Sequence, residues 1–291
     1  MNRKFSTIDN NLYQKNMTSS GKNKQVVVVG AGFGGIAAAL RARANGYDVT
    51  LLDRLSQIGG RAQTFRRDGF KHDAGPTVIT APFLFEELFT LFGKNANDYY
   101  TAVALDTWYE FIFEDNKKFC YTGDIEHTYE EIRKFDEEDV AGYQNLLKAS
   151  EKIFEVGFTQ LAAKPFTSFF QMIKLIPKLI KLRSYKTVYQ LVSSYIKNPY
   201  LRKVFSMHPL LVGGNPYSTT SIYTLIHYLE RKWGIHFIMG GTSALVSSLE
   251  TLMVEEGIKI QTDFDVASIN IDQRTKRVTE VIDVDGNKIK A

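Results

Sequence analysis

The feature that most constrains the fold is a glycine-rich turn between a β-branched run and a helical segment. The run is QVVVV (Gln25–Val29), and GAGFGG (30–35) follows it with the glycine spacing G-x-G-x-x-G. A continuous apolar run of this kind predicts a central strand of a parallel sheet, while Phe33–Ala44 has the composition of a helix. A second strand is predicted at Val49–Asp53. The chain therefore opens as a βαβ unit.

Each glycine of the turn has a predicted physical role. Gly30 makes the tight turn out of the strand, Gly32 leaves room for a pyrophosphate, and Gly35 lets the helix pack close to the sheet. The helix N-terminus then offers free N–H groups and a positive dipole to phosphates. Asp53 ends the second strand 23 residues after Gly30, where its carboxylate can accept hydrogen bonds from ribose hydroxyls. We therefore predict a dinucleotide site, whose loop also contains Ala31, Phe33 and Gly34.

A second glycine pair distinguishes between the possible dinucleotides. Arg54 follows the ribose acid directly, and Gly59-Gly60-Arg61 comes a few residues later. Such a pair is not needed to hold NAD. It resembles the extended fingerprint of FAD-dependent amine oxidases, in which the arginine helps to bind the pyrophosphate. The resemblance favours FAD as the cofactor.

The charge of the chain is unevenly distributed. Residues 164–203 contain nine Lys or Arg and no Asp or Glu, so the rest of the chain carries 27 − 32 = −5. In KLIPKLIKLRSYK (174–186), Lys174, Lys178 and Lys181 share one face of a helix. Pro177 disfavours helical geometry at Ile176, so the sequence leaves open whether one helix continues through it or a second helix starts there. The segment is either a lid helix over the protein's own core or an interfacial helix that lies on anionic lipid.

Several classes of function have no support in the sequence. No run of 18 apolar residues is present, so no membrane-spanning helix is expected. The chain has one cysteine and five histidines without metal-ligand spacing, so neither an intramolecular disulfide nor a metal site is predicted. No nucleic-acid motif is present, and nucleic acid is not an expected partner. Residues 1–24 are polar and are predicted to form a disordered tail.

Longer stretches of the sequence carry a family resemblance. These are GAGFGG, GGRA, FKHDAGPTVIT (70–80), FDEEDVAGY (135–143) and the segment from HPLLVGGNP to GGTSALVSSL (208–249). Together they resemble the bacterial-type phytoene desaturase family of carotenoid biosynthesis, almost continuously from Val26 to about Ile289. The resemblance implies an FAD-dependent enzyme that removes hydrogen from a long polyene such as phytoene.

The resemblance also implies a fold and residue roles. The fold is α/β and amine oxidase-like, with a Rossmann-type FAD-binding domain (25–100 and 232–291) and an inserted mixed substrate-binding and helical domain that faces the membrane (101–231). The segment from Asp73 to Thr77, which includes Pro76, would lie towards the flavin ring. The backbone of Val266 would contact the adenine side. No catalytic base is predicted, because Phe170-Gln171 stands where many bacterial members carry a charged pair.

Some expectations stay open at this point. The family has Glu more often than Asp at position 53, and it is longer at the C-terminus, so a chain ending at Ala291 is expected to bind FAD weakly and to turn over nothing. The alternatives are a carotenoid isomerase, a retinol saturase relative, a C30 desaturase or an inactive membrane-associating fragment. The expected location is peripheral, on the cytoplasmic face of the cell membrane. No oligomeric state is predicted.

Overall fold

A computed structural model describes residues 24–160 and 169–291, without the side chains of 160, 169–172 and 174. Nearly all of the predicted tail lies outside this range. The described residues form two compact units, one from residues up to 78, 83–103 and 237–291, and the other from 79–82 and 104–236. The flavin-binding and substrate-binding roles predicted for the two parts of the chain remain predictions.

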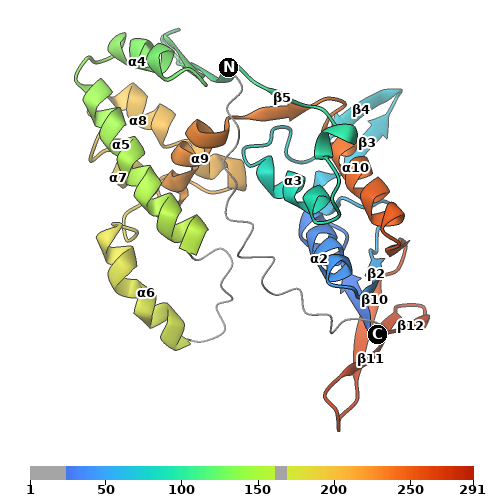
Figure 1. The fold of residues 1–291 in the computed structure, drawn as a ribbon. Coiled ribbons are helices and arrows are strands. Elements are labelled where there is room, and N and C mark those ends of the chain that lie inside the picture. The colour runs from blue at the N-terminus through green and yellow to red at the C-terminus, as the bar shows by residue number, and fades with distance from the viewer. Residues whose placement is uncertain (1–23, 161–168) are drawn as a thin grey trace. The chain divides into compact units, whose positions relative to one another are not determined.

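The first unit is built on the predicted βαβ opening (Figure 1). β1 (Gln25–Val29) pairs in parallel with β2 (Asp48–Leu52), and β2 pairs in parallel with β9 (Lys259–Gln261). The helix α2 (Phe33–Ala44) connects β1 to β2 and packs against both strands.

The remaining elements of this unit are short. β3 and β4 form a hairpin, β10, β11 and β12 form an antiparallel sheet, and β5 pairs with β8. Gly286 adopts a φ of 86° in the turn between β11 and β12, a conformation that glycine adopts readily. The bounds are β3 Thr64–Arg67, β4 Phe70–Asp73, β5 Ala102–Ala104, β8 His236–Ile238, β10 Val266–Ile271, β11 Val278–Asp283 and β12 Lys288–Lys290, with the helices α3 Phe83–Thr90 and α10 Thr242–Glu255 and the 3₁₀ turns Gly60–Ala62 and Ala96–Asp98.

The prediction that Gln25–Val29 is a central strand was wrong. Within the described residues, the sheet order is β1-β2-β9, so β1 lies at an edge and Val29 is half exposed. The apolar run has another cause, because β1 is covered on both faces. Val28 faces α2 beside Gly35, and Val27 packs against a cluster formed by Leu52, Phe264 and Val281.

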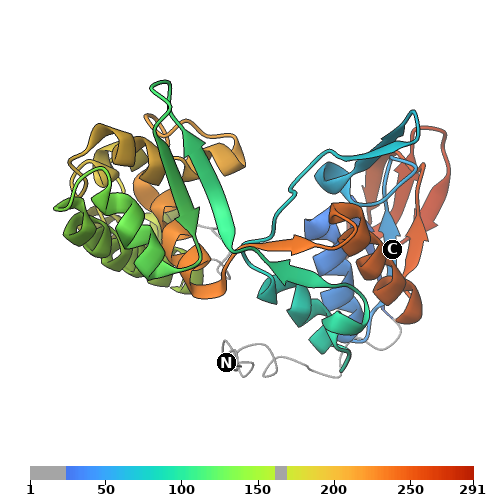
Figure 2. The same cartoon turned by 90° about the horizontal axis from the view of Figure 1, so that it is seen from above.

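The second unit combines a hairpin with helices. The β6–β7 hairpin, which is the long green hairpin of Figure 2, is followed by α4 and α5. Local capping explains several helix starts. Asp124 accepts the Glu126 N–H at the start of α4, and Asn198 precedes Pro199 at the start of α8. The bounds are β6 Thr107–Ile112, β7 Lys118–Thr122, α4 Ile125–Arg133, α5 Asp139–Phe154, α6 Phe169–Lys181, α7 Val188–Val192, α8 Pro199–Phe205 and α9 Leu225–Trp233, with a π-helical turn Glu155–Gln160 and 3₁₀ turns His208–Val212 and Ser221–Thr224.

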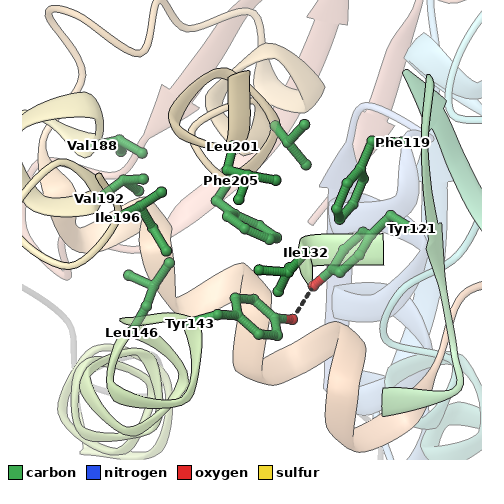
Figure 3. Close-up of a cluster of buried hydrophobic side chains, with 11 residues drawn as sticks. Phe119, Tyr121, Ile132, Tyr143, Leu146, Val188, Val192, Ile196, Leu201 and Phe205 are labelled. Atoms are coloured by element: carbon green, nitrogen blue, oxygen red, sulfur yellow. Dashed lines mark hydrogen bonds between the residues drawn. The ribbon is translucent and has the colours of Figure 1, made fainter. Parts of the chain in front are cut away.

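The core of the second unit is aromatic (Figure 3). The hydroxyls of Tyr121 on β7 and Tyr143 on α5 lie 2.7 Å apart, and the Tyr143 ring stacks on Phe205 with centroids separated by 4.5 Å. Arg231 of α9 lies over the rings of Trp108 and Tyr121, at 4.7 and 4.6 Å from their centroids. Buried aromatic pairs of this kind stabilise a core beyond their apolar area alone.

The helix α6 decides between the two alternatives that the sequence left open at Pro177. It continues through Pro177 to Lys181, so Pro177 does not begin a second helix. The chain then leaves the helix at Arg183, which has a φ of 57°, and the Ser184 N–H donates to the Leu179 carbonyl at 2.9 Å. Among the described residues, no helix has both the length and the apolar character needed to cross a membrane.

Candidate dinucleotide-binding site

The glycine turn has the geometry that its sequence predicts. Gly30 has a φ of 99°, and its N–H donates to the Leu52 carbonyl at 2.7 Å. A Cβ atom on Gly35 would lie 1.7 Å from the Gly30 carbonyl oxygen, so no larger residue fits between α2 and the turn. The helix α2 begins at Phe33 without a side-chain cap or an acidic residue in its first turn. Its N-terminal N–H groups and positive dipole therefore suit an anionic group.

The second glycine pair lies directly against this turn. The Gly59 N–H donates to the Ala31 carbonyl at 2.7 Å, and a Cβ atom on Gly60 would lie 2.9 Å from the Gly32 Cα. Gly75 packs in the same way, because its Cβ would lie 2.1 Å from the Arg61 carbonyl oxygen. Three segments that are distant in sequence thus meet backbone to backbone, and glycine at these positions allows the close approach.

Asp53 ties the turn to the second strand. It is only 7% exposed, and its Oδ2 accepts the Ala31 N–H at 2.6 Å while its Oδ1 accepts the Leu55 N–H at 2.9 Å. We predicted this carboxylate as a ribose acceptor, and the structure adds a role in holding the glycine turn. A carboxylate oxygen can accept more than one hydrogen bond, so the two roles are compatible.

The other predicted residues lie around this centre within the first unit. Phe33 packs edge-on against Phe85, with ring centroids 5.0 Å apart, and Gly34 has open space beside its Cα. Val266 packs on the cluster of Leu52, Phe264 and Val281, and the Phe264 N–H donates to the Asp53 carbonyl at 2.9 Å. The residues with exposed side chains are Arg54, Arg61, Pro76 and Thr77.

Sequence reasoning missed the capping role of Asp73. Its Oδ2 accepts the Thr242 N–H at 3.0 Å at the start of α10, and its Oδ1 accepts the Thr64 hydroxyl at 3.0 Å. Gly241 leaves the space, because a Cβ there would lie 2.4 Å from Asp73 Oδ2. The signal was present in the sequence: a helix that begins after Gly240-Gly241 has no capping side chain of its own and needs one from another segment.

The Asp53 contacts lead to a mutational prediction. Replacing Asp53 with alanine leaves the Ala31 and Leu55 N–H groups without their acceptor, so we expect FAD affinity to fall about tenfold or more. Asp53→Glu keeps the charge and the acceptor and should change the affinity by about threefold or less. Flavin fluorescence titration of the gene product measures both values. An equal loss of FAD affinity in the two variants would contradict the role given to the Asp53 carboxylate.

Comparison with known proteins agrees with this geometry. Residues 33–291 match the family described as flavin containing amine oxidoreductase. A phytoene desaturase (lycopene-forming) from Pseudescherichia vulneris is 42% identical over 90% of this chain and 53% of its own length. Another from Pantoea ananas is 45% identical over 80% of this chain and 48% of its own length. The predicted resemblance to phytoene desaturases is thereby confirmed.

A solved structure supports the fold. An oxidoreductase from Methanosarcina mazei superposes with a TM-score of 0.56 at 17% identity, over 92% of this chain and 57% of its own. The predicted amine oxidase-like α/β fold is confirmed, and the family implies a flavin cofactor. The chain spans about half the length of the relatives it matches. Because the family match covers most of the sequence, the chain belongs to the flavin-containing amine oxidoreductase family.

Proposed function

We propose that the gene product containing this chain is an FAD-dependent desaturase of a phytoene-like polyene in carotenoid biosynthesis. The observation that carries the proposal is the 42% identity to a phytoene desaturase (lycopene-forming) over 90% of the chain. The glycine turn supports the cofactor part, because Gly30 has the positive φ and Gly35 the close backbone contact that a dinucleotide-binding turn needs. The substrate is assigned because the similar proteins are phytoene desaturases and because a flavin can accept hydride from a hydrocarbon.

The residues of the first unit fit the ADP half of FAD. In this proposal the turn 30–35, Gly60 and Arg61 hold the pyrophosphate, Asp53 holds the ribose, and the Val266 backbone lies on the adenine side. Arg54 adds positive charge nearby, and Pro76 and Thr77 border the flavin ring. When bound, the flavin supplies a hydride acceptor for a substrate carbon. The protein's part is to position a hydrocarbon without polar groups and to exclude water, so binding rests on apolar area.

Pigment formation tests the proposal. The gene product is expressed in cells that accumulate phytoene, and the carotenoids are extracted and separated by chromatography. We expect phytoene to be replaced by a coloured product with a longer conjugated system. Phytoene that stays unchanged beside folded, flavin-loaded protein would contradict the proposal. Products that differ from phytoene only in double-bond geometry would favour an isomerase instead.

We also propose that α6 lies on a membrane surface, on the cytoplasmic face. The helix exposes Ile173, Ile176 and Ile180 at 43%, 47% and 58%, so the described residues leave part of this apolar face uncovered, which supports an interfacial helix over a lid. Exposed lysines accompany them, at Lys178 and Lys181. Apolar side chains with cations beside them are typical of helices that lie in a membrane interface. The polyene substrate dissolves only in the lipid phase, which supports the same partner.

Charge reversal on α6 tests the membrane proposal. Replacing Lys174, Lys178 and Lys181 with glutamate removes three cations of about 1 kcal/mol each at an anionic surface and adds repulsion. We expect the protein to move from the membrane fraction to the soluble fraction on sedimentation. A matched control reverses three exposed lysines of the first unit, Lys259, Lys276 and Lys290. If both triple variants divide between the membrane and soluble fractions in the same way, the lid interpretation of α6 is favoured instead.

A further inference from the structure

An open pocket in the second unit follows α6 directly and involves no residue of the dinucleotide site. It has a volume of about 650 Å³, and its lining residues lie between α6 and α7, within α7 and directly after α7. The left-handed conformation of Arg183 ends α6 and places the first lining residues immediately after it. The lining residues are Tyr185, Lys186, Tyr189, Gln190, Ser193 and Ser194.

The lining side chains are rich in hydrogen-bond donors. The Lys186 ammonium donates one hydrogen bond to Ser194 Oγ at 3.0 Å and has two further N–H groups. The Gln190 side-chain oxygen accepts the Thr187 N–H at 3.0 Å, which leaves its NH₂ group as the donor. Ser193 Oγ is inaccessible to solvent and has no hydrogen-bond partner within the described residues. Two tyrosines add hydroxyl groups, so a ligand with several acceptor oxygens would satisfy this pocket.

The charge around the pocket has a single sign along the chain. No Asp or Glu occurs from residue 156 to residue 229, a stretch that contains nine Lys or Arg. None of the lining residues is acidic. A pocket with one ammonium group, several neutral donors and no carboxylate suits an anion of the phosphate type, which accepts hydrogen bonds on several oxygens.

The aromatic residues identify the source of the anion. Tyr189 contacts Tyr217 with ring centroids 4.5 Å apart, while Tyr185 and Tyr217 are 70% and 60% exposed. Exposed tyrosines beside cations are characteristic of the headgroup level of a membrane. The pocket also continues from α6, the helix assigned above to the lipid surface.

We propose that this pocket binds the phosphate group of an anionic lipid headgroup, with Lys186 as its cation and Gln190 as a neutral donor. The proposal rests on the membrane partner proposed for α6 and extends it. The helix supplies apolar contact with the lipid, and the pocket supplies recognition of the headgroup.

Vesicle flotation with matched lysine variants tests the pocket. Lys186→Gln keeps a donor for Ser194, and Lys203→Gln makes the same charge change at an exposed position on α8. The vesicles contain phosphatidylcholine with either phosphatidylglycerol or a fatty acid at equal surface charge. On phosphatidylglycerol, we expect Lys186→Gln to lower affinity about tenfold or more and Lys203→Gln about fivefold or less. On fatty-acid vesicles, we expect the two variants to lose affinity equally.

Three outcomes would overturn the proposal. Equal losses for both variants on phosphatidylglycerol would show diffuse charge attraction without a pocket. An equal loss of affinity by Lys186→Gln on both vesicle types would show that the pocket does not recognise the phosphate. Binding of soluble glycerol phosphate that depends on Lys186, without vesicle binding, would assign the pocket to a free phosphate ester. Pigment formation is measured separately. A protein that binds vesicles as expected but forms no pigment would count against the desaturase proposal alone.

Discussion

Replacing Gly35 with alanine is expected to lower the free energy of unfolding by about 3 kcal/mol or more. The added methyl carbon would lie 1.7 Å from the Gly30 carbonyl oxygen and 2.9 Å from its carbon. Both neighbours are backbone atoms of the turn, so α2 must move away from β1 to make room. Urea denaturation of the purified chain, followed by circular dichroism, measures the change without any need for bound flavin.

The adjacent glycine provides the control for this experiment. A Cβ on Gly34 meets no atom within 4 Å, and Gly34 lies in the same first turn of α2. Gly34→Ala should therefore leave the free energy of unfolding unchanged or raise it by up to about 1 kcal/mol through better helix propensity. Similar destabilisation by both substitutions would show that the close helix–turn contact does not determine the stability of this unit.

Replacing Arg231 with methionine is expected to destabilise the second unit by about 3 to 5 kcal/mol. The guanidinium donates to Tyr143 Oη at 3.0 Å, to the Thr122 carbonyl at 2.7 Å and to Thr128 Oγ1 at 2.9 Å, while it lies over two aromatic rings. Methionine retains much of the volume but none of the donors, so these acceptors lose their partner. Tryptophan fluorescence during urea unfolding reports the change, because Trp108 contacts the guanidinium directly.

The neighbouring Lys232 serves as the control for Arg231. Its ammonium lies 4.6 Å from the Trp233 ring centroid, but its side chain is exposed. Lys232→Met removes the same charge and should cost about 1 kcal/mol or less, as is usual for an exposed cation–π contact. A loss for Lys232→Met as large as that for Arg231→Met would mean that overall charge, and not the buried hydrogen bonds, sets the stability.

The sequence predicted the conformation of the glycine turn well because that turn depends on backbone geometry. Gly30 needs a positive φ and Gly35 needs the absence of a Cβ, and only glycine satisfies both requirements. The contact of Gly60 with Gly32 follows the same rule at a greater separation in sequence. Glycines that are needed for a positive φ or a close backbone contact can be recognised from their spacing when a strand precedes them and a helix follows.

Features that depend on contacts between distant segments were not predictable. The Asp73 cap on α10 joins residues 169 positions apart, and nothing in the local pattern specifies the partner. The edge position of β1 was missed because α2 covers one face of the strand and the cluster of Leu52, Phe264 and Val281 covers the other, which produces the apolar run expected of a central strand. The passage of α6 through Pro177 stayed open in the sequence, because the local preference of proline against a helix interior does not decide whether a helix continues.

A single-turnover experiment tests the central claim most directly. The purified gene product is loaded with FAD, mixed without oxygen with phytoene in lipid vesicles, and followed by visible absorbance and by chromatography of the extracted polyene. The account predicts that oxidised-flavin absorbance is lost in step with the formation of one new double bond per flavin. Unchanged flavin absorbance with folded, flavin-loaded protein, or flavin reduction without a desaturated product, would contradict it.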